Sequence, residues 1–282
     1  MTREDLPHVR LDHPSGARAV VYLQGAHVAS WTDASGVERL FVSEHARWEP
    51  GFAIRGGIPV IFPQFADQGP LPKHGFARTA RWEEVEAGTG AEGAAFVRLR
   101  LADDEATRAL WPHPFRAEVR VALAAATLEV ALRVENTGDG VMAFTCALHT
   151  YLRVDDVRRT TVEGLRGVRY LDKLESGAAH LEERDAVAFA RETDRVYVAA
   201  PDRLRIRDAA GGRAVTLEKE GFRDAVVWNP WEALARRLPD LGGDEYPRML
   251  CVEPANAAAP VRLAAGEAWT GTQRLRAESA GS

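Results

Sequence analysis

The chain has 282 residues, 46% of them hydrophobic, which is enough for one large globular domain or two small ones. The formal net charge is -5 and both signs are dispersed, which argues against a basic nucleic-acid-binding surface and a polybasic membrane-binding segment. Residues 1–16 are charged and lack an apolar signal sequence, and no apolar run is long enough to cross a membrane, so we expect a cytoplasmic protein. The two cysteines, Cys146 and Cys251, lie in apolar runs and are expected to be reduced and buried.

An alternation of apolar and polar residues with a period of two predicts most of the elements. The clearest case is 115–123, and 128–134 repeats the pattern before a turn at 136–138, so these two strands are expected to form a hairpin. In chain order, strands are predicted over 17–24, 27–33, 40–43, 81–87, 96–102, 115–123, 128–134, 142–154, 157–163, 196–200, 204–208, 214–220, 224–228, 249–253 and 267–276. One helix is predicted over 231–238.

Many short strands without regularly alternating helices indicate an all-β fold, a large antiparallel β-sandwich with few short helices. No linker rich in Pro, Gly or Ser divides the chain, and no period of 20–50 residues suggests a repeat protein. We therefore expect a single domain over 1–282, with its core at about 17–276 and a flexible C-terminal tail after Arg276.

Two segments combine glycine, proline and positive charge in a way that a sandwich core does not require. In 55–65, two glycines free the backbone and two prolines restrict it, which places Arg55 at the mouth of a defined loop. In 71–78, Lys73, His74 and Arg78 surround a glycine, which suits a pocket for a polar or anionic ligand. For any one of these residues alone, a basic surface loop is the favoured interpretation.

Two further residues follow apolar runs. Glu253 comes after 249–252, so we expect it at the end of a buried strand, where burial and a nearby cation tune a carboxylate as a general base. His149 ends the comparable run 144–148, and its unperturbed pKa of about 6.5 lets it donate and accept protons near neutrality. A salt-bridged glutamate and a hydrogen-bonded core histidine are the structural alternatives.

Six segments, taken together and in order, resemble a known family. They are RGGIPVIFPQF (55–65), LPKHGFAR (71–78), ALHTYL (147–152), ETDRVY (192–197), VVWNPW (226–231) and CVEPAN (251–256). The resemblance is to the hexose-6-phosphate mutarotases, also called glucose-6-phosphate 1-epimerases, of the aldose 1-epimerase or galactose mutarotase-like superfamily. It extends from about residue 17 to residue 275.

The resemblance implies a galactose mutarotase-like supersandwich with a sugar cleft, no metal or organic cofactor, and a monomer. It implies interconversion of the α and β anomers of D-glucose 6-phosphate and related aldohexose 6-phosphates. The catalytic residues of the family match His149 and Glu253. Its substrate-binding residues match Arg55, His74, Arg78 and Asp194, and we add Lys73 for the phosphate and Trp228 as a face for the sugar.

In this reading Glu253 is the base toward the anomeric hydroxyl, and His149 starts protonated and donates to the ring oxygen. Three alternatives stay open. Within the mutarotase class, the alternative is an enzyme for free aldoses such as galactose or glucose, for which the basic loop would be unnecessary. A non-catalytic carbohydrate-binding sandwich would need no acid and base, and a glycoside hydrolase or lyase would need two carboxylates, with Asp194 as the partner of Glu253.

Overall fold

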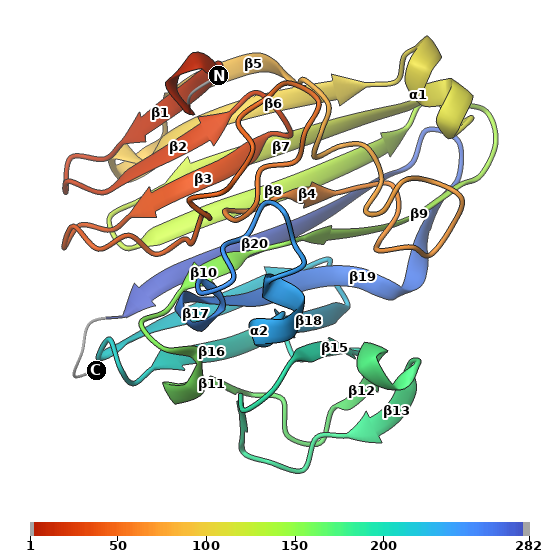
Figure 1. Cartoon of the computed structure of the whole chain (residues 1–282). Coiled ribbons are helices and arrows are strands. Elements are labelled where there is room, and N and C mark those ends of the chain that lie inside the picture. The colour runs from red at the N-terminus through yellow and green to blue at the C-terminus, as the bar shows by residue number, and fades with distance from the viewer. Residues whose placement is uncertain (1–2, 279–282) are drawn as a thin grey trace.

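The computed structural model describes residues 3–278, and its strands form three antiparallel sheets (Figure 1). The largest sheet has nine strands. It includes the predicted hairpin, whose two strands pair with each other and with further strands on their outer edges. In spatial order these are β14 (Ala186–Ala188), β11 (Thr160–Glu163), β16 (Arg203–Asp208), β17 (Arg213–Glu220), β20 (Ala268–Glu278), β8 (Thr127–Asn136), β7 (Phe115–Leu123), β6 (Ala95–Ala102) and β5 (Glu83–Thr89).

The second sheet has eight strands and carries the site described below. Seven follow the order β13 (Ala178–Leu181), β12 (Arg169–Asp172), β15 (Thr193–Tyr197), β18 (Asp224–Asn229), β19 (Met249–Leu263), β9 (Met142–Leu148) and β4 (Val60–Ile61). The eighth, β10 (Tyr151–Arg153), also pairs with β19. A small sheet of β1 (His8–Asp12), β2 (Arg18–Tyr22) and β3 (His27–Thr32) completes the strands.

The two large sheets share one apolar core, which makes the fold a β-sandwich. Alternate residues of β7, such as Val119, and of β17, such as Leu217, pack in the same buried cluster as Val227 of β18 and Val252 of β19. The predicted hairpin of β7 and β8 is confirmed, with Phe115 opposite Asn136 and the inward residues fully buried. The period of two in the sequence therefore reports the side of each strand that faces the core.

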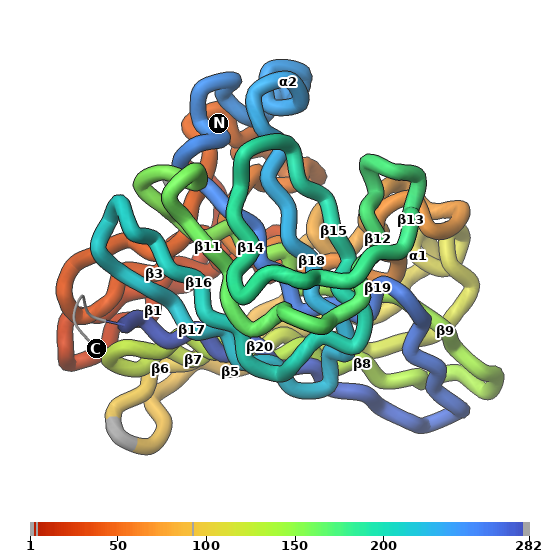
Figure 2. Tube along the Cα trace, turned by 90° about the horizontal axis from the view of Figure 1, so that it is seen from below, coloured from red at the N-terminus to blue at the C-terminus, as the bar shows by residue number. Residues whose placement is uncertain are grey.

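The strand β19 separates two environments. Leu250 and Val252 belong to the main core, whereas Cys251 and Ala255, four residues apart, pack in small clusters on the opposite face of the sheet. Glu253 shares that opposite face because side chains alternate along a strand. In Figure 2 the helix α2 (Trp231–Ala235) lies on this side of β18 and β19, away from β8 and β20.

Several predicted bounds were wrong in the region that leads to the site. Segment 40–43 forms isolated bridges, not a strand. Segment 142–154 divides into β9 and β10 because the backbone turns at His149, where the N–H of Thr150 donates to the carbonyl of Leu148 at 2.8 Å. Segment 157–163 begins with a 3-10 turn, so only its second half is a strand, β11.

Further corrections concern the last third of the chain. The strand predicted over 249–253 continues to Leu263, so Glu253 lies inside β19 and not at its end, although a proline follows it. The strand predicted over 196–200 is β15 and ends at Tyr197. The helix expected over 231–238 ends at Ala235, and β20 includes the first two residues of the expected tail. The remaining tail residues, 279–282, lie outside the described residues.

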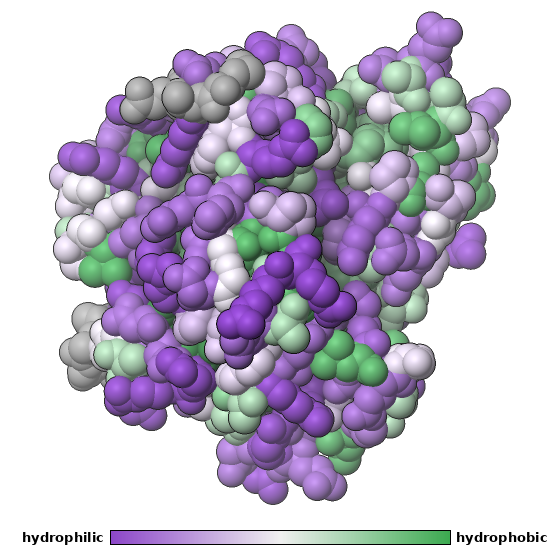
Figure 3. All heavy atoms as spheres, in the orientation of Figure 1, coloured by the Kyte–Doolittle hydropathy of each residue, from purple (hydrophilic) through white to green (hydrophobic). Residues whose placement is uncertain are grey.

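The sequence also failed to predict β1, β4 and the three short strands β12, β13 and β14, which have only two to five residues each. The helix α1 (Glu105–Leu110) was missed as well, although Asp104 and Thr107 form a reciprocal capping box at its start. The face in Figure 3 is mostly hydrophilic, with apolar side chains in small separate groups. Within residues 3–278 no helix has the length and apolar character needed to cross a membrane.

Candidate active site

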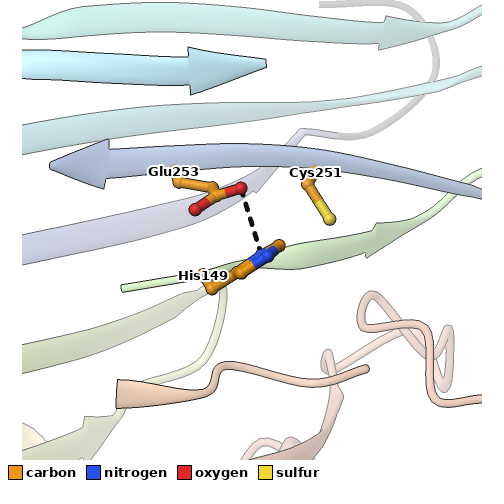
Figure 4. Close-up of side chains that lie close together, drawn as sticks. All are labelled: His149, Cys251 and Glu253. Carbon is orange, nitrogen blue, oxygen red and sulfur yellow. Dashed lines mark ion pairs between the residues drawn. The ribbon is translucent and has the colours of Figure 1, made fainter. Parts of the chain in front are cut away.

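The centre of the site is the pair His149 and Glu253 (Figure 4). His149 lies at the turn between β9 and β10, where its own N–H donates to the carbonyl of Pro59 at 3.0 Å. Glu253 lies on β19 opposite Val226 of β18. The Nδ1 atom of the histidine is 3.1 Å from Oε1 of the glutamate, and the two side chains are only 10% and 2% exposed. An acid and a base are thus held together by the backbone of neighbouring strands.

The pair keeps unused hydrogen-bonding capacity. The imidazole of His149 stacks on Tyr151, with ring centres 4.7 Å apart, and meets the edge of Trp228. The short contact to Glu253 lacks the alignment of a hydrogen bond, so the buried Nδ1 atom has no hydrogen-bond partner among the described residues, and neither has Oε2 of Glu253. Both atoms can therefore accept or donate a proton to a ligand that enters the cleft.

Burial shifts the pKa values of the pair toward the neutral forms. Burial, with the negative charge of Asp194 in second place, raises the pKa of Glu253 well above its usual range. Burial, followed by repulsion from His74 and nearby cations such as Arg55, lowers the pKa of His149 well below its usual range. Both shifts favour the uncharged forms of the two side chains in the free protein.

Two arginines form a positive wall of the cleft, and they differ in how their charge is balanced. Arg55 donates to the hydroxyl of Tyr151 and to Oδ1 of Asp240, each at 3.0 Å. Arg78 donates only to the backbone carbonyl of Lys73, at 2.8 Å. No carboxylate in residues 3–278 forms an ion pair with Arg78, and burial lowers its pKa. Arg78 is therefore the cation with the most charge to offer an anionic ligand.

Two lysines add to this wall. Lys73 is 61% exposed and its Nζ lies 3.9 Å from Asp67, so solvent screens most of its charge. Lys173, from the 3-10 turn that follows β12, lies 3.3 Å from Oδ2 of Asp194 and 5.4 Å above the ring of Phe65. Burial raises the pKa of Asp194, and the lysine opposes this shift. Asp194 and Lys173 thus form a polar side of the cleft.

His74 is held as a neutral hydrogen-bond donor. The N–H of Ala66 donates to its Nδ1 at 3.2 Å, so the ring proton is on Nε2. Burial lowers the pKa of His74 to about 2, with repulsion from Arg78 as the next cause. The tight loop requires Gly75, since a Cβ there would lie 2.3 Å from the carbonyl oxygen of Phe62.

All eight residues singled out in the sequence line one cleft of about 210 Å³: Arg55, Lys73, His74, Arg78, His149, Asp194, Trp228 and Glu253. Sequence reasoning missed the other lining residues, Phe65, Lys173, Val226, Leu234 and Leu238. It also missed Asp240, behind Arg55. Lys173 lies in a segment without strand periodicity, and the sequence offers no signal for it. A wider depression of about 330 Å³ beside Trp111 has no ionisable side chain in its lining.

Known proteins match this arrangement over almost the whole chain. The family model of the aldose 1-epimerases matches residues 7–276. The chain belongs to the aldose 1-epimerase family. Its relatives in this family include a candidate glucose-6-phosphate 1-epimerase of Cenchrus ciliaris, which is 42% identical and aligns over 93% of this chain and 83% of its own.

Two bacterial members extend the comparison. A candidate glucose-6-phosphate 1-epimerase of Escherichia coli K12 is 36% identical over 90% of this chain and 85% of its own. The crystal structure of a candidate mutarotase, YeaD, from Salmonella typhimurium superposes with a TM-score of 0.90 at 32% identity, covering 98% of this chain and 92% of that one. The sandwich expected from the sequence, and its galactose mutarotase-like type, are therefore confirmed.

Proposed function

We propose that the protein is a hexose-6-phosphate mutarotase, which interconverts the α and β anomers of D-glucose 6-phosphate and related aldohexose 6-phosphates. The observation that carries this proposal is the position of His149 and Glu253, 3.1 Å apart, in the same cleft as the unneutralised Arg78. The names of the relatives from Cenchrus ciliaris and Escherichia coli point to the same substrate.

The reaction needs one base and one acid. In the proposed first step Glu253 takes the proton of the anomeric hydroxyl, and His149 gives a proton to the ring oxygen as its bond to C1 breaks. The open aldehyde rotates about the C1–C2 bond. His149 then recovers its proton as the hydroxyl attacks the other face of the carbonyl, and Glu253 returns its proton to the new anomeric oxygen. Both groups end as they began.

This step requires protonated His149 and ionised Glu253, the reverse of what burial favours. The expectation that His149 starts protonated thus conflicts with the pKa directions in the free protein. The two arrangements, one with the proton on Glu253 and one with it on His149, contain the same number of protons. Burial is the main cause that holds the pKa of His149 down, and repulsion from His74, Arg55, Arg78 and Lys173 adds to it. A bound phosphate offsets the charges of these cations, so in this proposal substrate binding raises the pKa of His149 toward the protonated form that the step requires.

The charge of the cleft supports a phosphorylated sugar. Four cations, Arg55, Lys73, Arg78 and Lys173, face three carboxylates that pair with them, Asp67, Asp194 and Asp240, so Arg78 is left without a counter-charge. A phosphate monoester, with a charge of about −1.5 to −2 at neutral pH, would supply that counter-charge. A neutral sugar would leave the half-buried Arg78 without an anionic partner. In this proposal Arg78 binds the phosphate, with Arg55 beside it and Lys73 at the rim.

The remaining polar groups suit a sugar. The Nε2–H of His74 is a donor for a hydroxyl or ether oxygen, and Asp194 is an acceptor for hydroxyl groups. The indole of Trp228 provides an apolar surface for the ring. Together these groups hold the sugar so that only its anomeric end rearranges.

The test uses α-glucose 6-phosphate and NMR exchange spectroscopy between the two anomers. The wild-type protein is expected to raise the exchange rate far above the buffer value. His149→Ala and Glu253→Gln are expected to return the rate to the buffer value while the melting temperature stays that of a folded protein. Near-normal exchange in either variant would refute the assignment of that residue.

The same experiment separates the alternatives. A non-catalytic sugar-binding protein would leave exchange at the buffer rate with wild-type protein. A free-aldose mutarotase would exchange glucose as efficiently as glucose 6-phosphate. A glycosidase built on Asp194 and Glu253 would release reducing sugar from a disaccharide, and Asp194→Asn would then abolish activity more completely than His149→Ala.

A further inference from the structure

The pair has a third neighbour that the reaction does not use. One ring nitrogen of His149, the sulfur of Cys251 and a carboxylate oxygen of Glu253 all lie within 4.8 Å of one another, and all three residues are buried. Figure 4 shows the three side chains around a common space, with Cys251 and Glu253 projecting from β19. The two β19 residues face the same way because they are two positions apart.

The cluster offers unused ligand atoms. Neither Nδ1 of His149 nor Oε2 of Glu253 has a hydrogen-bond partner among the described residues, although both atoms are buried. Burial of such atoms without partners is unfavourable, and a bound ligand would relieve it. The thiol of Cys251 is not engaged in a disulfide.

The donor set matches a particular class of metal. Thiolate, imidazole and carboxylate are the ligands that Zn²⁺ selects, whereas Mg²⁺ and Ca²⁺ prefer oxygen alone. Bond lengths of about 2.0 to 2.3 Å in a tetrahedron separate neighbouring ligand atoms by about 3.3 to 3.7 Å. The histidine and glutamate atoms are already 3.1 Å apart, and the ligand atoms of all three residues lie within 4.8 Å of one another, so they are close to the spacing of three vertices of such a tetrahedron.

We propose that His149, Cys251 and Glu253 form a binding site for Zn²⁺, with the fourth position open to the cleft. On binding, the thiol of Cys251 and the carboxyl group of Glu253 each release a proton to solvent, and the resulting thiolate and carboxylate balance the two charges of the ion. Bound zinc occupies the atoms that transfer protons, so it inhibits mutarotation. This consequence rests on the proposed function, whereas zinc binding itself does not.

The other buried cysteine provides a matched control. Cys146 lies on β9 in the main core, where its sulfur is 3.9 Å from Nδ2 of Asn256. It does not belong to the cluster around His149. Cys251→Ala and Cys146→Ala therefore remove the same thiol from two buried positions, only one of which lies beside His149 and Glu253.

The first experiment uses Co²⁺ as a spectroscopic substitute for Zn²⁺ and needs no activity. Wild-type protein and Cys146→Ala are expected to bind one Co²⁺ with an intense thiolate-to-cobalt absorption in the near ultraviolet, which added Zn²⁺ removes. Cys251→Ala is expected to lose this absorption. Absence of the band in the wild-type protein would overturn the proposal without bearing on the mutarotase assignment.

The second experiment titrates Zn²⁺ during anomer exchange of glucose 6-phosphate, with Mg²⁺ as the comparison ion. Zn²⁺ is expected to inhibit the wild-type protein, and Cys251→Ala is expected to need about 100-fold more zinc, since even loss of an outer partner of a ligand costs 10- to 100-fold in affinity. Equal inhibition in both proteins would overturn the site. If Cys251→Ala does not fold, Cys251→Ser takes its place. If the wild-type protein shows the cobalt absorption but no anomer exchange, the mutarotase proposal is refuted and the metal site stands.

Discussion

Replacing Arg78 with alanine tests whether the cleft recognises a phosphate group. Arg78 is the cation of the cleft whose guanidinium has no carboxylate partner in residues 3–278 and donates only to a backbone carbonyl. Its Nε atom is buried without a hydrogen-bond partner. A phosphate beside it would receive charge-assisted, bidentate hydrogen bonds from a guanidinium that has no carboxylate to compete for them in residues 3–278.

The expected loss follows from the strength of such contacts. A hydrogen bond between charged groups contributes about 1.5 to 3 kcal/mol, and each 1.36 kcal/mol corresponds to a factor of ten. Arg78→Ala is therefore expected to lower kcat/KM for glucose 6-phosphate by about 10- to 150-fold. Free glucose has no phosphate to lose, so its exchange rate should not change.

The assay is NMR exchange of both sugars, with Lys73→Ala as the control. Lys73 is exposed and loosely paired with Asp67, so its removal should cost at most about fivefold for either sugar. Equal losses for glucose and glucose 6-phosphate in Arg78→Ala would refute the phosphate role of Arg78. If Lys73→Ala lowers kcat/KM for glucose 6-phosphate more than Arg78→Ala does, the phosphate binds at the rim of the cleft beside Lys73.

Three more predictions concern the surroundings of the cleft. Asp240→Asn leaves Arg55 without its carboxylate and should tighten binding of inorganic phosphate in calorimetry; weaker binding would mean that the carboxylate instead holds the arginine in place. Gln273 is a fully buried amide whose Oε1 accepts a hydrogen bond at 2.7 Å from the hydroxyl of Thr150, the residue after His149, and whose Nε2 has no partner among the described residues. Gln273→Leu removes this support behind His149, so kcat should fall with little change in KM or melting temperature. An unchanged kcat would contradict this. The pKa of Glu253 is raised above its ordinary 4.5 in the folded protein, so above pH 4.5 the unfolded chain loses this proton before the folded protein does. Folding stability should therefore fall as pH rises from 4.5 toward the folded pKa. The melting temperature of Glu253→Gln should lack this part of the pH dependence.

The sequence predicted the strands well where one face is buried and the other is solvated. Segments such as 115–123 alternate because each strand separates core from solvent. The same rule failed at 40–43 and 142–154, where strand pairing is interrupted by the turn at His149 and by single bridges. Pro254 also misled the prediction, because a proline indicates the end of a strand. In the structure β19 continues past Pro254, since β18 pairs with it on one edge and β9 pairs with it on the other edge from Ala255 onward.

The candidate site was predicted through motifs and not through local pattern. His149 and Glu253 are 104 positions apart, and only the pairing of β9, β10 and β19 brings them together. Lys173 and Asp240 escaped notice because neither lies in a distinctive motif. Their roles arise from ion pairs with Asp194 and Arg55, which depend on tertiary placement and cannot be read from neighbours in the chain.

The alternation along β19 bears on how the protein can be engineered. Because Leu250 and Val252 fill the core while Glu253 lines the cleft on the opposite face, substrate preference and folding depend on different positions of one strand. A combinatorial library confined to cleft-facing positions of β18 and β19, such as Val226, would explore new sugars without opening cavities between the sheets. Libraries at the intervening positions would instead yield mostly unfolded clones.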